Sequence, residues 1–126
     1  YAQSHQNDPL GAVVAREVIR TIKEDNLIDR ANRIGGVLAS GLRKIKDRVS
    51  PIKDVRWRGL MAAVDINEDA DASVTIRIHR ELVRRGYVVG RRPGINVLRL
   101  DPSLTIEESD IQGFLATFES VLTDLG

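Results

Sequence analysis

Residues 54–66 read DVRWRGLMAAVDI, and this stretch decides the fold of the chain. Val55 and Trp57 precede the pair Arg58-Gly59, and residues 60–66 follow it with alternating character. Short runs of this kind on either side of a glycine are typical of β-strands joined by a turn. We therefore predict two short strands around Arg58-Gly59.

Two amphipathic helices are predicted before these strands. The first begins at Asp8 and Pro9, because aspartate can cap a helix and proline suits the first helical position, and it ends at residues 25–26. The second has one apolar face over residues 27–49. The glycine pair 35–36 costs this helix about 1 kcal/mol per glycine relative to alanine, so we expect close packing against another element there.

A third helix and two further strands are predicted next. The helix has its apolar positions at Val74, Ile78, Leu82 and Val83. Gly86 is placed as its C-terminal stop. Residues 87–89 and 96–100 read as strands, and residues 93–94 as the turn between them.

The last helix has a clear entry signal at residues 105–108, which read TIEE. This spacing predicts a capping box, in which Thr105 and Glu108 satisfy each other's free backbone amides. An apolar stripe follows over residues 111–125. The order of elements predicts an α/β chain of the α+β two-layer kind, with a small, mostly antiparallel sheet and helices packed on one face.

The composition is that of one globular domain. The chain has 126 residues, of which 42% are hydrophobic and 29% are charged, and a net charge of +1. This near-balance gives no reason to expect nucleic acid or a membrane as partner. The absence of cysteine excludes disulfides and fits a reducing, cytoplasmic compartment, and no apolar run approaches the roughly 20 residues that span a bilayer. The first residues, YAQSH, carry neither an initiator methionine nor a signal pattern, so we expect a fragment of a longer protein.

The sequence offers no self-contained active site. His5 and His79 lack the spacing of metal ligands, so we expect no metal site and a surface or boundary position for His79. No serine lies in a nucleophile-elbow pattern, and no glycine-rich loop follows a strand. We therefore assign no catalytic residue.

Seven arginines fall close together with a single acid, Glu81, among them. They are Arg77, Arg80, Arg84, Arg85, Arg91, Arg92 and Arg99. A nucleic-acid-binding α/β module would use such a patch on phosphates. The alternative is that the helical arginines coat a solvated face, and the scarcity of aromatic side chains for base stacking favours that interpretation.

Four segments carry recognisable motifs. They are residues 4–12 (SHQNDPLGA), 54–65 (DVRWRGLMAAVD), 84–89 (RRGYVV) and 96–106 (NVLRLDPSLTI). In this order and spacing they resemble the C-terminal part of class III pyridoxal 5′-phosphate (PLP) aminotransferases, where the last three read DVRGxGLMxxxE, RGLLV and NVLRLxPPLTI. The resemblance implies the small domain of a fold type I enzyme, inactive on its own.

The resemblance implies roles for individual residues. Ser4, with Gln3 beside it, is similar to the hydroxyl residue that contacts the PLP phosphate of the neighbouring subunit, where a helix N-terminus also favours an anion. Arg99 is similar to the small-domain arginine that binds the substrate carboxylate through its planar fork. The Schiff-base lysine is implied to lie upstream of Tyr1. None of the four lysines of the chain is expected to replace it.

The resemblance also implies an organisation and a set of partners. Residues 1–26 correspond to the cofactor-proximal loop and leading helix, and residues 27–126 to the small domain. The expected partners are the large catalytic domain of the same protein, a second subunit in a homodimer, and amino acid and 2-oxo acid substrates.

The sequence departs from the family pattern at two points, and the second of them leaves the reaction open. Trp57 stands where the family has glycine, which we expect to alter the strand bend without touching the chemistry. The form HQNDP at residues 5–9 is closer to the dialkylglycine decarboxylase branch. Decarboxylation or racemisation therefore stays an alternative to amino transfer, and a non-catalytic interaction domain is a third possibility.

Overall fold

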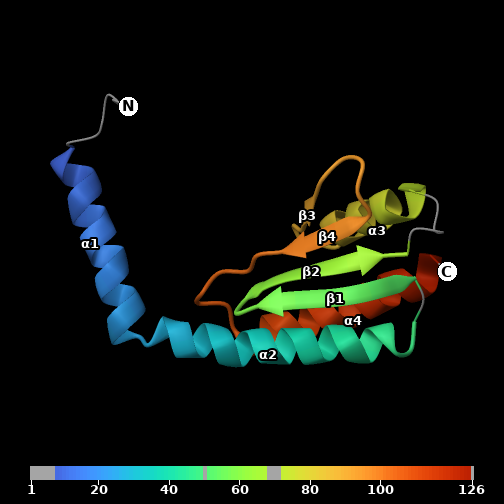
Figure 1. Ribbon diagram of the computed structural model, residues 1–126, viewed down its shortest axis with the longest axis horizontal. Helices are drawn as coiled ribbons and strands as arrows, with labels where there is room; N and C mark the ends of the chain where they lie inside the picture. Colours follow the sequence, from blue (N-terminus) through green and yellow to red (C-terminus); the bar gives the residue numbers. More distant parts are fainter. Residues whose placement is uncertain (1–7, 50, 68–71, 126) are drawn as a thin grey trace.

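The computed structural model describes residues 8–49, 51–67 and 72–125 (Figure 1). Its elements are α1 (Pro9–Glu24), α2 (Leu27–Lys46), β1 (Ile52–Arg58), β2 (Met61–Ile66), α3 (Ala72–Arg84), β3 (Gly90–Arg91), β4 (Val97–Leu100) and α4 (Glu108–Leu125). The predicted order of helix, helix, two strands, helix, two strands, helix is confirmed.

The four strands form one antiparallel sheet in the order β1-β2-β4-β3. Arg58 pairs with Met61, so only Gly59 and Leu60 form the turn between β1 and β2. Gly59 has a φ of 55°, the left-handed conformation that a glycine at the first position of a two-residue hairpin provides. The hairpin predicted at residues 54–66 is therefore confirmed.

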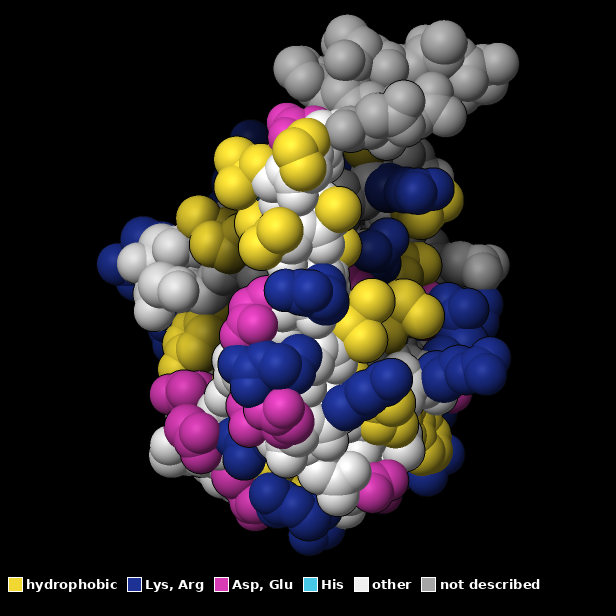
Figure 2. Space-filling view, turned by 90° about the vertical axis from the view of Figure 1, so that its left-hand side faces the viewer, with side chains coloured by type: hydrophobic (Ala, Val, Ile, Leu, Met, Phe, Trp, Pro, Cys, Tyr) yellow, Lys and Arg dark blue, Asp and Glu magenta, His cyan; other side chains and the backbone are white. Residues whose placement is uncertain are grey.

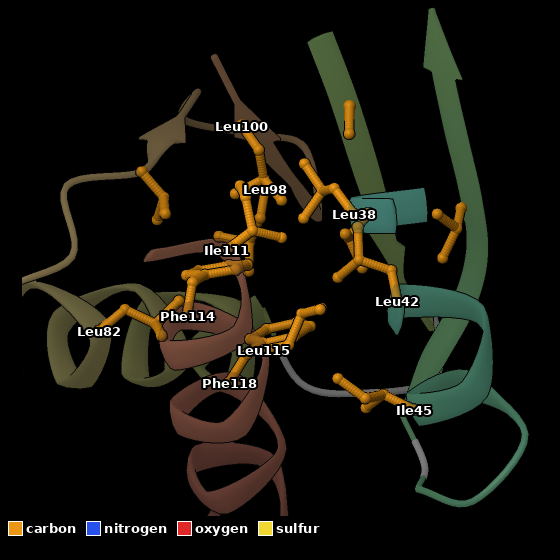
Figure 3. Close-up of a cluster of buried hydrophobic side chains, with 14 of the residues drawn as sticks. Leu38, Leu42, Ile45, Leu82, Leu98, Leu100, Ile111, Phe114, Leu115 and Phe118 are labelled. Atoms are coloured by element: carbon orange, nitrogen blue, oxygen red, sulfur yellow. The ribbon is translucent and has the colours of Figure 1, made fainter. Parts of the chain in front are cut away.

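Three helices cover one face of this sheet (Figure 1). The inward residues of the strands are buried, as Val64 in β2 and Leu98 in β4 illustrate. Figure 3 shows the cluster where α2, α3, β4 and α4 meet, built from Leu38, Leu42, Ile45, Leu82, Leu98, Leu100, Ile111, Phe114, Leu115 and Phe118. The two-layer architecture with helices on one face is confirmed.

The glycine pair in α2 has one tightly packed member. A Cβ atom on Gly35 would lie 1.9 Å from the carbonyl oxygen of Gly59, so the hairpin turn rests directly on the helix backbone. A Cβ on Gly36 would meet no atom within 4 Å. The close approach expected at this pair is therefore made by Gly35 alone.

Helix α1 stands away from the layered part of the chain (Figure 1). The Asp8 carboxylate accepts a hydrogen bond of 2.9 Å from the Leu10 amide, as a capping aspartate should, and Asn26 in the left-handed conformation separates α1 from α2. No residue of α1 is buried. Within the described part of the chain, no helix is long and apolar enough to cross a bilayer.

The strand predicted at residues 87–89 is wrong. The strand at this edge covers only Gly90–Arg91. The reason lies at the end of α3, where the amides of Gly86 and Tyr87 bond to the carbonyls of Val83 and Leu82. These two hydrogen bonds, around Gly86 in the left-handed conformation, end the helix. The Tyr87 amide is therefore already bonded and cannot donate to a neighbouring strand.

The capping box predicted at residues 105–108 is also wrong. Helix α4 begins at Glu108, three residues after Thr105, whose hydroxyl lies 2.8 Å from that of Ser103. The two glutamates pair with α2 instead: Arg30 reaches Glu107 and Arg33 reaches Glu108, each at 2.9 Å. Contacts between α2 and the start of α4 have replaced the local cap.

Candidate functional site

The outward face of the sheet carries a row of side chains at one level of the register. Arg56 of β1 lies opposite Ala63 of β2, Ala63 lies opposite Arg99 of β4, and Arg99 lies opposite Gly90 of β3. Small residues thus flank Arg99 on both neighbouring strands. No described helix packs over this face, because α2, α3 and α4 lie on the other one.

Arg99 points to the outward face, because its neighbours Leu98 and Leu100 are buried on the inner one. Its side chain is 56% exposed, and its Nε donates a hydrogen bond of 2.6 Å to Oδ2 of Asp101. An ion pair this exposed contributes about 0–1 kcal/mol to stability, so folding alone gives little reason for a cation here. The structure places Arg99 where a planar guanidinium can receive an anion from outside the sheet.

A second ion pair lies on the same face. Arg56 donates two hydrogen bonds, of 3.1 and 2.7 Å, to the carboxylate of Asp65. The hydrogen bond to Asp65 raises the pKa of the Arg56 guanidinium above its usual value. In the ranges that the structure describes, Arg58 at the hairpin end forms no ion pair.

Two shallow hollows share Leu104 in their walls, one beside the hairpin end and one beside α1. One has a volume of about 370 Å³ and includes Arg58, Met61 and Asp101 in its wall. The other, of about 420 Å³, lies between α1 and Leu104 and has mostly apolar walls. Sequence patterns indicated neither hollow, because each is lined by segments that lie far apart in the sequence.

Trp57, the departure from the family motif, lies on the opposite side of β1 from Arg56. The guanidinium carbon of Arg43 in α2 lies 4.2 Å from the centre of the Trp57 ring, a cation–π contact. The strand pairing runs regularly from Asp54 to Arg58, and the irregular step in β1 falls between Ile52 and Asp54. The pairing therefore has no bulge at Trp57.

Three of the four helical arginines, Arg77, Arg80 and Arg84, are exposed, as the interpretation of a solvated helix face predicts. Arg84 and Arg85 both bond to Glu81, and Arg85 also reaches Asp124 of α4 at 2.8 Å. The pKa of the Glu81 carboxyl is lowered to about 2, chiefly by the hydrogen bond from Arg84 and next by the one from Arg85. Arg85 is partly buried and links α3 to α4, so it alone among the four helical arginines departs from the solvated face.

His79 lies at the boundary, as predicted. Its Nε2 is 3.1 Å from the carbonyl oxygen of Val89, and its side chain is partly buried. No group of three or more potential ligands for a metal ion is found among the residues that the structure describes.

The cofactor contacts predicted from the motif are not located. Ser4, Gln3 and His5 lie outside the described residues. The lysines are all described, and none is buried: they are Lys23, Lys44, Lys46 and Lys53. No lysine side chain in the chain has the enclosed setting that a covalently bound cofactor needs.

Comparison with known proteins gives one consistent family. The sequence matches the family described as aminotransferase class III over residues 2–122. It is 33% identical over 115 residues to 4-aminobutyrate aminotransferase of Escherichia coli, covering 86% of this chain and 27% of that protein. It is 32% identical over 122 residues to a leucine/methionine racemase of Thermococcus litoralis, covering 94% of this chain and 28% of that protein.

The fold gives the same result. The crystal structure of acetylornithine aminotransferase from Elizabethkingia anophelis superimposes with a TM-score of 0.89 and 25% sequence identity, covering 98% of this chain and 31% of that one. The chain therefore spans less than a third of the length of the relatives it matches. It belongs to the class III aminotransferase family and corresponds to the C-terminal portion of its members.

Proposed function

We propose that this chain is the small domain of a PLP-dependent enzyme that transfers an amino group between an amino acid and a 2-oxo acid. The observation that carries the proposal is Arg99, which presents a guanidinium on the uncovered face of the sheet. The family match and the aminotransferases among its relatives support the same reaction.

Arg99 binds the substrate carboxylate in this proposal. Its fork of N–H donors matches the two oxygens of a carboxylate, and Ala63 and Gly90 leave room beside it. Fixing the carboxylate orients the rest of the substrate, so the reacting carbon is held in place before the chemistry begins. The contribution of this chain is therefore to bind and orient the substrate.

PLP supplies the electron sink for the reaction when it is bound. Ser4 and Gln3 are the residues of this chain proposed to contact its phosphate. Because no lysine of the chain is buried, we propose that the lysine that carries PLP belongs to the large domain. The chain alone is then inactive.

The large domain is also the proposed partner of α1. Leu10, Val13, Val14, Val18 and Ile19 of α1 are each more than half exposed. Figure 2 shows hydrophobic side chains along the upper part of this helix and charged side chains farther down. Exposed apolar surface of this kind marks an interface. A further contact with a second subunit in a homodimer is part of the same proposal.

Substitution of Arg99 in the full-length enzyme tests the proposal. Arg99→Ala should cost on the order of 2–4 kcal/mol in transition-state binding, because it removes charge-assisted hydrogen bonds to the substrate. Arg99→Lys keeps the charge but loses the fork, so it should strongly raise KM for amino acids. Amine substrates without a carboxylate serve as the control and should change little. A kcat/KM for amino acids within about threefold of wild type in Arg99→Ala would reject the assignment.

Racemisation is a second candidate reaction, favoured by the similarity to the leucine/methionine racemase. The two reactions separate when a single enantiomer of an amino acid is supplied without a 2-oxo acid. A racemase then keeps inverting its substrate, whereas an aminotransferase stops after the first half-reaction because no 2-oxo acid takes up the amino group. Continuous loss of optical rotation under these conditions would show that the enzyme racemises its substrate, and the proposal of amino transfer would be rejected.

A further inference from the structure

We infer that Asp101 is a positioning residue for Arg99. Its carboxylate holds Nε of the guanidinium and leaves both terminal nitrogens, Nη1 and Nη2, for the carboxylate of the substrate. This inference rests on the proposed role of Arg99 and adds a second residue to the same site.

The backbone brings the two side chains together. Asp101 follows the last residue of β4, and residues two apart in an extended chain lie on the same side. Pro102 comes next and disfavours a helical conformation at Asp101, so the chain stays extended there. The Asp101 side chain therefore leaves the strand on the outward face, beside Arg99, and the result is the hydrogen bond of 2.6 Å.

Asp101 is the sole anchor of the guanidinium within the described part of the chain. No other hydrogen bond or ion pair of Arg99 is found there. Gly90 presents only backbone on one side: a Cβ atom at that position would lie 3.4 Å from Cβ of Arg99. Ala63 on the other side carries a single methyl group, which cannot hold a polar head. Without Asp101, the long and half-exposed Arg99 side chain has nothing to select one rotamer.

The geometry of the guanidinium decides which donors stay available. An arginine can receive a carboxylate along the edge formed by Nε and one terminal nitrogen, or along the edge formed by both terminal nitrogens. Asp101 occupies Nε, so the first edge is blocked. The site thus presents the second edge, which can still make two parallel hydrogen bonds to one carboxylate group.

Asp101 has two opposite effects on substrate binding: it positions Arg99, but its negative charge repels the carboxylate of the substrate. A carboxylate beside Arg99 weakens the field that attracts a second carboxylate. The two effects separate on substitution, because asparagine keeps an acceptor oxygen for Nε but loses the charge, whereas alanine loses both. Asp101 is 43% exposed at the side chain, so neither substitution disturbs the core.

The experiment uses the full-length enzyme with Asp101→Ala, Asp101→Asn and Arg99→Ala. Each variant is assayed with an amino acid and with an amine that lacks a carboxylate. Binding of butyrate, a carboxylate without amine or carbonyl, is measured separately by calorimetry. We expect Asp101→Ala to raise KM for the amino acid and Kd for butyrate on the order of tenfold, because a misplaced clamp loses its alignment. Asp101→Asn should stay within about threefold of wild type or bind more tightly, and the amine should respond to neither.

Three results would overturn the inference. Asp101→Ala could bind butyrate as well as wild type or better, which would show that the charge alone matters. It could impair the amine as much as the amino acid, which would show a general structural role. Asp101→Asn could be as weak as Asp101→Ala, which would show that the acceptor oxygen is not what holds Arg99.

Arg99→Ala distinguishes this failure from a failure of the proposed function. If Arg99→Ala weakens butyrate binding while Asp101→Ala does not, only the positioning role is wrong. If Arg99→Ala leaves butyrate binding and amino acid kinetics unchanged, the carboxylate site itself is misassigned and the role of Asp101 is rejected with it.

Discussion

The contact between Gly35 and the hairpin turn gives a test of the fold at two neighbouring positions. We compare Gly35→Ala with Gly36→Ala, the same chemical change one residue along the same helix. At Gly35 the new Cβ would lie 1.9 Å from the carbonyl oxygen and 2.5 Å from the carbonyl carbon of Gly59, which are backbone atoms that no rotamer change can move. At Gly36 it would meet nothing within 4 Å.

The two variants should change stability in opposite directions. Overpacking a fixed contact costs about 3 kcal/mol or more, and the better helix propensity of alanine returns about 1 kcal/mol, so Gly35→Ala should lose roughly 2 kcal/mol. Gly36→Ala has only the propensity gain and should become about 1 kcal/mol more stable. With a urea m-value of about 2 kcal/mol/M, the unfolding midpoints of the two variants should differ by roughly 1.5 M.

Urea unfolding of the 126-residue chain measures this difference. Trp57 is the single tryptophan and lies in the strand that leads into the turn, so its fluorescence reports on the hairpin directly. Equal midpoints for the two variants would refute the packing of the turn on α2. Stabilisation by Gly35→Ala would do the same.

Three further outcomes are expected. The pKa of Glu81 is lowered from 4.5 to about 2, so the stability that this carboxylate adds is present above pH 4.5 and is lost as the pH falls toward 2. The difference in unfolding midpoint between wild type and Glu81→Gln should therefore shrink over this range. A constant difference would contradict the prediction. Val14→Asp combined with Val18→Asp should reduce dye binding and self-association of the isolated chain, and a wild-type chain that is strictly monomeric and binds no dye would count against an interface on α1. Incubation of the isolated chain with PLP, followed by desalting, should leave no stoichiometric absorbing adduct, because every lysine is at least partly exposed; a stable band near neutral pH would contradict this.

Local signals predicted most of the fold. The cap at Asp8, the turn at Gly59 and the stop at Gly86 each depend on a few adjacent residues, and each lies where it was expected. The errors have two causes. The strand expected at residues 87–89 looked apolar enough, but the closing bonds of α3 use the Tyr87 amide. The capping box failed for a different reason, because its glutamates bond to arginines of α2 far away in the sequence.

The candidate site also has features that adjacent residues predict and features that appear only in the folded chain. The family motif singled out Arg99 as a residue that meets a carboxylate, and the burial pattern of β4 shows that its side chain points to the outward face of the sheet. The sequence could have predicted the pairing of Arg99 with Asp101, because residues two apart on a strand share a face. The sequence could not have predicted the small residues beside Arg99, because Ala63 and Gly90 become its neighbours only when the strands pair in this order.

The position of α4 in the chain has a consequence for synthesis in the cell. This helix supplies six buried residues to the core, and it ends about 60 residues beyond the end of β2. A ribosome working at about 5–20 residues per second takes on the order of 3–12 s to cover that distance. Until α3 and α4 have both been made, the inner side of the hairpin, with Val64 and Ile66, lacks part of the cover that the folded chain gives it. A chaperone that recognises extended apolar segments therefore has seconds in which to bind the nascent chain, and its binding site disappears when Phe118 and Val121 reach the sheet.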